Sequence, residues 1–274
     1  MKLCIPKLTH AIPSQGRGSV TAVASVGDDV FVLRNKSQEV EVYHAEKFAL
    51  KCYIKVAGLG FNAYGLAVCP NNSCLYASGL FSDSVHRVEL KAGNAAKNWS
   101  VSGRPAGLSV NKANNLIVVS CSVHELLEYT THGSLVRKIC LEAAGVSDPW
   151  HAVQLSSGDY AVSHGEQQGG VSVVGVDGKV VQRYGQSVTS EVGQMKNPTS
   201  LAVTKNDDIL VADNGNDRIA LIKKSTGCIE KLALQVEGGI QRPMALCLDE
   251  SRGRLYVGEY AGEYRLLLFD GVAV

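Results

Sequence analysis

The chain has 274 residues, of which 45% are hydrophobic and 19% are charged, and its formal net charge is +1. This balance supplies a large core and excludes global disorder. Because the net charge is close to zero, no long-range field draws the protein to nucleic acid or to an anionic membrane, and any such contact must come from a local patch.

The N-terminal segment MKLCIPKLTHAIPSQG contains no apolar run of signal-peptide length, and no stretch approaches the roughly 18 apolar residues of a membrane span. We therefore expect a soluble, cytoplasmic protein that makes no membrane contact. The eight cysteines stand mostly in apolar, strand-like runs, and no CxxC pair occurs. They are expected to be buried free thiols rather than disulfides or zinc ligands.

Along the chain, one unit recurs: a small apolar run, a second apolar run that ends in a small or charged residue, a polar connection, and further alternating runs. The second runs read VFVLR, LYASG, LIVVS, YAVS, LVAD and LYVGE. Their last residues are Arg34, Gly79, Ser120, Ser163, Asp213 and Glu259. A period of about 40 to 50 residues with several strands per unit indicates the blade of a β-propeller.

Each unit begins with an inner strand of small residues and ends with an outer strand in which apolar and polar residues alternate. The inner strands read SVTAVAS, AYGLAV, RPAGLSV, PWHAVQL, NPTSLAV and RPMALCL, and outer strands are expected at 50–56, 97–102 and 135–141. Four strands per unit predict one all-β domain over residues 1–274, a six-bladed propeller of four-stranded antiparallel blades.

The sixth unit ends after YRLLLFD without an outermost strand. Residues 2–8, KLCIPKL, are predicted to supply that strand and so to close the ring and remove an exposed sheet edge. Pro6 suits an outermost strand, where one side of the backbone needs no hydrogen-bond partner.

The fifth unit contains Pro198, LAV and DILVAD, followed by Asn216, Arg218 and Ile219. This pattern resembles the NHL-repeat family of six-bladed propellers, as in the C-terminal domain of tripartite-motif proteins. The resemblance implies a non-enzymatic scaffold that binds a protein, a peptide or single-stranded RNA, in a tripartite-motif-like protein. Only this unit carries the full polar pattern, so Asp213, Asn216 and Arg218 are interpreted as structural. We expect the Asp213 carboxylate to accept hydrogen bonds from the turn backbone, and Arg218 to reach a carboxylate or carbonyls of a neighbouring blade.

The loops between blades and the loops between second and third strands should meet at one mouth of the propeller. Aromatic side chains beside cationic ones there predict a peptide hot spot, and they equally suit stacked single-stranded bases. The predicted ligand-binding residues are Arg34, Tyr64, Phe81, Arg104, Trp150, His151, Arg242 and Tyr260. The alternative is that Tyr64 and Trp150 fill the channel as part of the core.

Six-bladed propellers also include enzymes, and a metal-dependent hydrolase or lyase with a site in the channel is the alternative function. Peptide-amidating lyases hold zinc through inner-strand histidines, and calcium-dependent lactonases use Glu, Asn and Asp at the channel centre. The residues expected to open the inner strands are Thr21, Tyr64, Ala106, His151, Thr199 and Met244, and the acidic and amide side chains expected near the mouth are Asp213, Glu259, Asn62 and Asn197.

A single histidine cannot form the three-ligand site that catalytic zinc needs. No glycine-rich phosphate loop stands between a strand and a helix, so no nucleotide cofactor is implied. We therefore expect no catalytic residue, no metal and no cofactor, but a monomeric propeller that binds a protein or peptide, with single-stranded RNA as the second candidate.

Overall fold

The computed structural model describes residues 6–91, 96–165, 169–186 and 193–272, and the regular elements within these ranges are almost all β-strands. The strands are β1 (Lys7–Ile12), β2 (Val20–Val26), β3 (Asp29–Arg34), β4 (Glu39–His44), β5 (Leu50–Lys55), β6 (Ala63–Cys69), β7 (Cys74–Gly79), β8 (Ser84–Glu89), β9 (Ala96–Ser100), β10 (Pro105–Val110), β11 (Leu116–Ser120), β12 (Glu125–Tyr129), β13 (Leu135–Cys140), β14 (Pro149–Gln154), β15 (Tyr160–His164), β16 (Gly170–Val174), β17 (Val180–Tyr184), β18 (Pro198–Val203), β19 (Ile209–Asp213), β20 (Arg218–Ile222), β21 (Ile229–Lys231), β22 (Pro243–Asp249), β23 (Arg254–Glu259) and β24 (Leu266–Asp270). Two 3-10 turns, η1 (Glu142–Ala144) and η2 (Asn214–Asn216), complete the regular elements of the described ranges.

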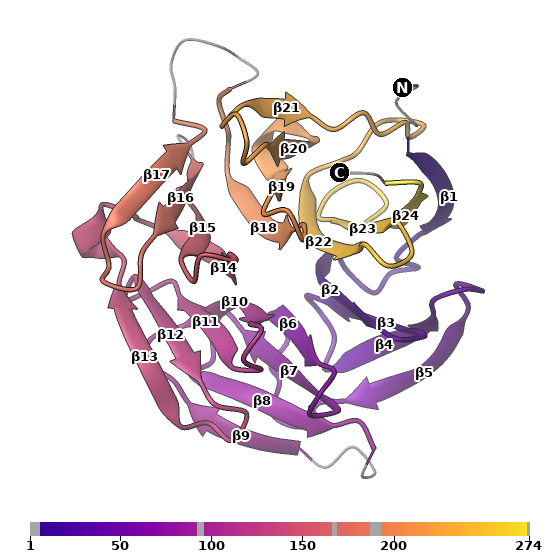
Figure 1. Ribbon diagram of the computed structural model, residues 1–274. Helices are drawn as coiled ribbons and strands as arrows, with labels where there is room; N and C mark the ends of the chain where they lie inside the picture. The colour runs from indigo at the N-terminus through magenta and orange to yellow at the C-terminus, as the bar shows by residue number, and fades with distance from the viewer. Residues whose placement is uncertain (1–5, 92–95, 166–168, 187–192, 273–274) are drawn as a thin grey trace.

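Across the described residues, the strands form six four-stranded antiparallel sheets around a central axis, as the blades of a propeller (Figure 1). Blades 1 to 5 are β2–β5, β6–β9, β10–β13, β14–β17 and β18–β21, and blade 6 joins β22, β23 and β24 to β1. The first strand of each blade lies beside the axis (Figure 1). The predicted six-bladed all-β propeller is confirmed.

The N-terminal strand closes the ring, as predicted, but it lies further along the chain than residues 2–8. Strand β1 pairs with β24 from Lys7 opposite Asp270 to Ile12 opposite Leu266. Pro6 precedes the strand, and residues 2–5 lie outside the described residues. Leu8 and Ile12 pack against the buried clusters on either side of blade 6, and this burial explains why the later segment forms the strand.

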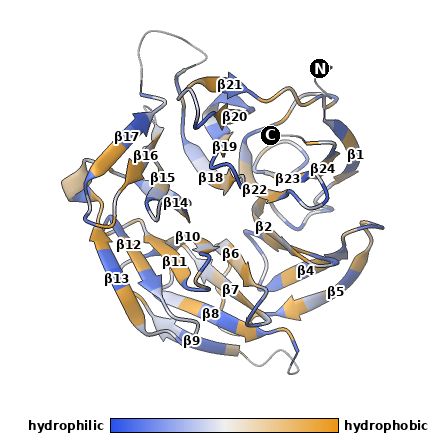
Figure 2. Ribbon diagram, in the orientation of Figure 1, coloured by the Kyte–Doolittle hydropathy of each residue, from blue (hydrophilic) through white to orange (hydrophobic). Residues whose placement is uncertain are grey.

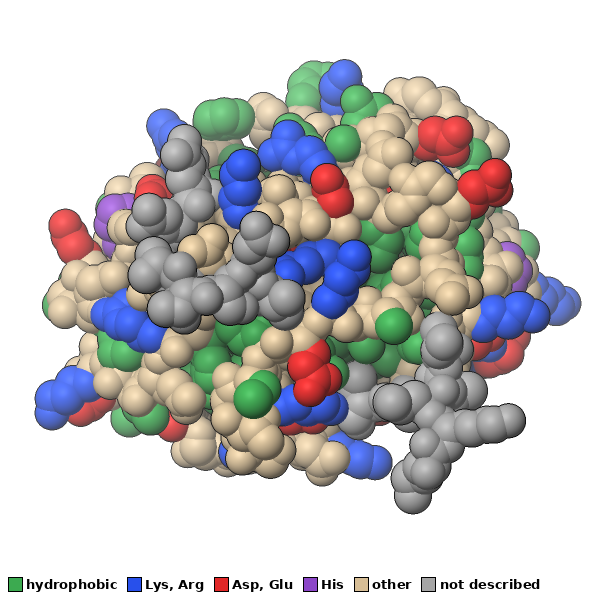
Figure 3. All heavy atoms as spheres, turned by 90° about the horizontal axis from the view of Figure 1, so that it is seen from above, with side chains coloured by type: hydrophobic (Ala, Val, Ile, Leu, Met, Phe, Trp, Pro, Cys, Tyr) green, Lys and Arg blue, Asp and Glu red, His purple; other side chains and the backbone are tan. Residues whose placement is uncertain are grey.

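Apolar side chains fill the space between neighbouring blades. One cluster joins Leu33 of blade 1 to Leu75 of blade 2, and another joins Tyr160 of blade 4 to Leu126 of blade 3. The outer strands alternate between hydrophilic and hydrophobic residues (Figure 2), and acidic, basic and apolar side chains are interspersed in the side view of Figure 3. The core is therefore a ring of interblade clusters, whereas the periphery is mixed in charge.

Side chains of the inner strands link adjacent blades around the axis. The Thr21 hydroxyl donates to the carbonyl of Ala63 at 3.0 Å, and the Ser109 hydroxyl donates to that of Ala152 at 2.7 Å. Small polar residues suit these positions because they satisfy backbone groups where six strands crowd together. This ring of contacts fixes the relative positions of the loops at the mouth.

The polar hexapeptide that follows β19 is organised around a buried ion pair. The fully buried Asp213 accepts a hydrogen bond from the backbone N–H of Lys196 at 2.8 Å. Its second oxygen accepts from the side chains of Asn216 at 2.9 Å and Arg218 at 2.7 Å. The structural interpretation of the three residues is supported, although the backbone donor belongs to the loop before β18 rather than to the turn.

Two other blades place a different ion pair at the same level. In blade 6, Glu259 accepts from the backbone N–H of Gln241 at 2.9 Å and from Arg265 at 2.7 Å. In blade 1 the charges are reversed, because Arg34 ends the second strand and pairs with Glu41 at 3.1 Å. Glu259 and Arg34 therefore replace the Asp of the repeat with other charged residues that also form an ion pair at this buried position.

The expectation for the cysteines is correct only in part. The seven described cysteines are free, but only Cys69 and Cys74 are buried. Cys52, Cys140 and Cys228 are exposed, because they stand on or next to outer strands with one face in solvent. None of the helical segments in the described ranges has the length and apolar character of a membrane span.

Candidate functional site

The propeller has a cavity of about 250 Å³ at one mouth of its channel. Its walls come from the starts of inner strands and from the loops that follow second strands, which meet at this end because consecutive strands are antiparallel. Four of the eight predicted ligand-binding residues line it: Tyr64, Trp150, Arg242 and Tyr260. The structure therefore brings together in one cavity residues from blades 2, 4 and 6.

The floor of this mouth cavity is a pair of aromatic rings. Tyr64 from β6 and Trp150 from β14 lie with ring centroids 5.7 Å apart and planes inclined by 34°. Blade 3 stands between these two blades and contributes only the small, buried Ala106 at this level, so the rings can meet across it. Tyr64 is buried, which raises its pKa and keeps its hydroxyl protonated.

The rim carries two arginines that stack on aromatic rings. The guanidinium carbon of Arg242 lies 5.6 Å from the ring centroid of Tyr260, on the wall of the cavity. Arg104, which precedes β10, lies 5.6 Å from the ring centroid of Phe81, which follows β7, and these two residues stand outside the cavity. Such cation–π pairs hold a flexible cation over an apolar surface.

The sequence placed Asn62 and Asn197 near the mouth but missed Asn35 and Asn214. These four asparagines form much of the cavity wall. Each directly follows a second strand or directly precedes an inner strand, so its position in the repeat was a usable signal. Asn197 donates to the side-chain oxygen of Asn214 at 3.3 Å. The side-chain oxygens of Asn35 and Asn197 and the indole Nε1 of Trp150 are buried and have no hydrogen-bond partner within the described part of the chain.

Arg34 does not belong to the mouth cavity. Its side chain is buried and its Nε donates to Glu41, while Nη1 donates to the carbonyls of Gly18 at 3.0 Å and Tyr264 at 3.1 Å. The sequence placed it on the mouth because it ends a second strand. Its donors are instead used within the fold, so a ligand-binding role for Arg34 is not proposed.

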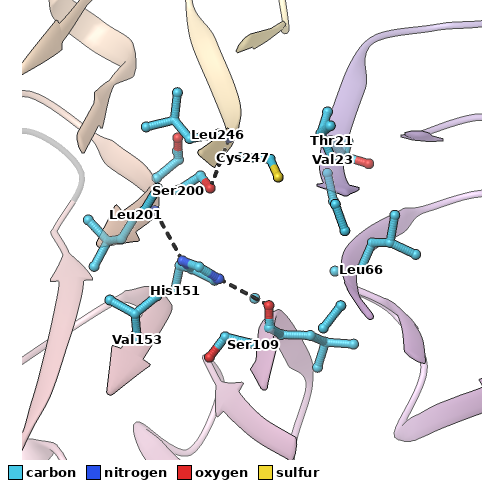
Figure 4. Close-up of a pocket in the computed structure, with 18 of the residues that line it drawn as sticks. Thr21, Val23, Leu66, Ser109, His151, Val153, Ser200, Leu201, Leu246 and Cys247 are labelled. Carbon is cyan, nitrogen blue, oxygen red and sulfur yellow. Dashed lines mark hydrogen bonds between the residues drawn. The ribbon is translucent and has the colours of Figure 1, made fainter. Parts of the chain in front are cut away.

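His151 lies below the mouth, in a channel cavity of about 290 Å³ lined by all six inner strands (Figure 4). The predicted register of β14 was wrong by one residue at this end. Pro149 faces His164 as Pro198 faces Asp213, so Trp150 rather than His151 stands level with Tyr64. A shift of one residue exchanges the two faces of a strand. For the same reason, His164 rather than Ser163 is the blade 4 counterpart of Asp213.

Both ring nitrogens of His151 are occupied by backbone groups of neighbouring blades (Figure 4). Nδ1 accepts from the N–H of Leu201 at 3.1 Å, and this contact fixes the tautomer in which Nε2–H donates to the carbonyl of Leu108, also at 3.1 Å. Burial lowers its pKa to about 4, so the ring stays neutral at physiological pH. The imidazole thus links three blades and has no free nitrogen for a metal or a proton transfer.

The residues considered for a channel metal do not assemble. Asn62 and Asn197 line the mouth cavity, whereas Asp213 and Glu259 are held in their ion pairs outside it. Among the described residues, no group of three or more His, Cys, Asp or Glu side chains is arranged to hold a metal ion. The donor geometry of the described ranges therefore gives the metal-dependent alternative no support.

Comparison with known proteins agrees with the propeller fold. A family model described as NHL repeat matches residues 195–220, which include Pro198, the end of β19 and the Asn216–Arg218 turn. The chain is an NHL-repeat β-propeller. No curated protein matches its sequence.

Solved structures share the propeller fold at low sequence identity. A protein of unknown function from Bacteroides thetaiotaomicron is 12% identical with a TM-score of 0.75, over 95% of this chain and 72% of that one. Hydrazine synthase from Kuenenia stuttgartiensis is 13% identical with a TM-score of 0.68, over 97% and 99% of the two chains. Virginiamycin B lyase from Staphylococcus aureus is 11% identical with a TM-score of 0.66, over 97% and 99%. At such identities the structural likeness shows a shared fold and does not assign an activity to this propeller.

Proposed function

We propose that this NHL propeller is a recognition module that binds a peptide segment of a partner protein at its mouth. The observation that carries the proposal is the mouth cavity itself, in which Tyr64, Trp150, Arg242 and Tyr260 converge from three blades. Aromatic residues and arginine are the side chains that most often dominate binding energy at protein interfaces. A preformed cavity also limits the ordering cost of binding.

The surface around the cavity supports the same function. Phe61 and Phe81, in the loops of blade 2 at this mouth, are 69% and 70% exposed, and Tyr264, in the blade 6 loop, is 40% exposed. Large apolar side chains clustered at one end of a protein indicate an interaction surface. An extended peptide could therefore place one group in the cavity and lie across these rings.

A catalytic role in the channel is less well supported. The channel histidine, His151, is neutral and has both nitrogens bonded to backbone. The hydroxyl of Ser109 donates to a backbone carbonyl, and that of Ser200 accepts from the N–H of Leu246 at 3.1 Å. Chemistry here would require these interblade contacts to break.

Single-stranded RNA is the second candidate, because the two stacked arginine–aromatic pairs also suit bases and phosphates. We further propose the setting expected from the sequence, a monomeric propeller in the cytoplasm that works in a tripartite-motif-like protein. In that setting the propeller supplies binding and the rest of the protein supplies any activity.

The test begins with peptides selected from a display library on the immobilised propeller. A Trp150→Ala, Arg242→Ala double variant should weaken their binding by about 2 kcal/mol or more, roughly 30-fold in Kd, without changing the β spectrum. Lys138→Ala is the matched control, because this exposed lysine lies on the outer strand β13 and pairs with Glu125.

Two results would overturn the proposal. Loss of binding in the outer-strand control but not in the mouth variant would place the site on the blade sides. Binding of random single-stranded RNA in preference to every selected peptide, with an affinity that falls steeply as salt rises, would make the ligand RNA instead.

A further inference from the structure

Arg242 occupies a backbone conformation that suits other residues better. The residue before the proline that opens β14, β18 and β22 adopts a left-handed conformation in each case, with φ of 48° at Asp148, 49° at Asn197 and 45° at Arg242. Asp and Asn tolerate this region because their short polar side chains bond locally, whereas Arg does so less readily. An arginine kept in a strained conformation at a cavity wall points to a functional use of its side chain.

The side chain of Arg242 is held ready for a ligand. Its backbone N–H donates to Asp217 at 2.7 Å, its Nε donates to the side-chain oxygen of Asn214 at 3.1 Å, and its guanidinium stacks on Tyr260. The two Nη groups make no hydrogen bond or ion pair within the ranges that the structure describes. A guanidinium with both Nη groups free presents the fork that binds a carboxylate in a bidentate manner.

The rest of the cavity supplies the complementary groups. No described Asp or Glu lines it, so the charge of Arg242 is uncompensated there. Trp150 offers an unpaired N–H donor, and Asn35 and Asn197 offer unpaired oxygens as acceptors within the described chain. The site therefore calls for a ligand that combines an anion with N–H donors.

We infer that the mouth cavity binds the C-terminal carboxylate of a peptide. Arg242 and the Trp150 N–H hold the carboxylate oxygens, and the last amide N–H groups of the peptide donate to the asparagine oxygens. A phosphate has no amide N–H groups to pair with those oxygens. A volume of about 250 Å³ is below the range of about 300–1,000 Å³ for drug-sized ligands and suits a chain end. This inference rests on the proposed function and names its ligand group.

The test uses Trp150 as the reporter. The sequence has two tryptophans, so Trp99→Phe leaves Trp150 as the only source of indole emission. We would titrate this protein with N-acetyl-L-phenylalanine, with its carboxamide and with inorganic phosphate. The acid is expected to bind with a millimolar Kd, and the carboxamide and phosphate at least tenfold more weakly.

Arg242→Asn gives the decisive variant. It should weaken binding of the acid at least tenfold and at the same time raise the melting temperature, because asparagine suits the left-handed conformation. Lys97→Asn makes the same charge change at an exposed position of β9 and is the control. It should leave binding of the acid unchanged and should not raise the melting temperature. A role of Arg242 in folding alone would give a lower melting temperature and no loss of binding.

Any of four results would overturn the inference. The carboxamide or phosphate could bind as tightly as the acid, the acid could leave the emission of Trp150 unchanged, or the Arg242→Asn variant could bind the acid fully. A selected peptide that binds the mouth equally well with an amidated C-terminus would overturn it while the proposed function stands. Absence of any peptide binding at the mouth would overturn both.

Discussion

Asp213→Ala tests whether the signature acid of the fifth blade serves the fold. The substitution removes the acceptor for the Lys196 N–H and for the side chains of Asn216 and Arg218. It also removes the Asp213 carboxylate from Arg218, a residue that is only 8% exposed. Breaking a buried ion pair from one side costs about 3–5 kcal/mol, and a whole domain has only about 5–15 kcal/mol of stability.

We therefore expect Asp213→Ala to lower the free energy of unfolding by about 3–5 kcal/mol in urea denaturation followed by circular dichroism. Asp213→Asn keeps an acceptor for the Lys196 N–H and should cost less. Asp213→Ala, Arg218→Ala should cost less than the two single changes added together, because both single changes remove the same interaction. Glu230→Ala, at an exposed position on β21, is the control and should change stability by less than about 0.5 kcal/mol.

Peptide binding by the fraction of Asp213→Ala that remains folded should be unchanged. Lost binding with unaltered stability would make Asp213 a ligand residue and refute its structural assignment. A strictly additive double variant would refute the coupling on which the magnitude depends.

Deleting residues 1–12 removes β1 with its five paired positions and should destabilise the protein by roughly 3–5 kcal/mol or cause aggregation. An unchanged melting curve and a monodisperse elution profile would contradict the closure of the ring by β1. Burial lowers the pKa of His151 and of His164 from 6.5 to about 4, so the unfolded chain takes up protons first as pH falls. The stability present above pH 6.5 should be lost between pH 6.5 and 4, by up to about 3 kcal/mol per histidine, and urea midpoints across that range measure it. Gly107→Ala would place a Cβ 2.5 Å from the His151 ring and from a backbone oxygen, and should lower the free energy of unfolding by about 1–3 kcal/mol. The Cβ of Gly60→Ala meets nothing within 4 Å, so this variant should lose less stability. Equal melting temperatures for the two variants would contradict this expectation.

The fold was predictable because a repeat fixes many positions at once. The ends of the second strands at Arg34, Gly79, Ser120, Asp213 and Glu259 were located correctly from one template. Blade 4 failed by one residue, at Ser163 instead of His164, because its loop differs in length and strands of small residues give little register information. The closing strand was placed too early, because residues 2–8 and Lys7–Ile12 are both acceptable as strands and the sequence does not show that Leu8 and Ile12 pack against blade 6.

The candidate site was predictable for residues whose place in the repeat decides which way their side chains point. Tyr64, Trp150 and Arg242 stand at the starts of inner strands, and all three line the mouth. Arg34 was misjudged because the sequence does not show that Glu41 lies opposite it inside blade 1. Asn62 and Asn197 were expected near the mouth, whereas Asn35 and Asn214 were missed because asparagine in a loop normally indicates only a turn.

The central claim is that ligands enter the mouth cavity, whose floor includes Trp150, and the emission of Trp150 in the Trp99→Phe protein tests it most directly. Addition of a peptide selected on the propeller should shift or quench this emission with the same Kd that an independent method gives. The change should disappear in the Arg242→Ala variant at the same peptide concentration. Binding that leaves the emission of Trp150 unaltered would place the ligand elsewhere on the propeller and contradict the account.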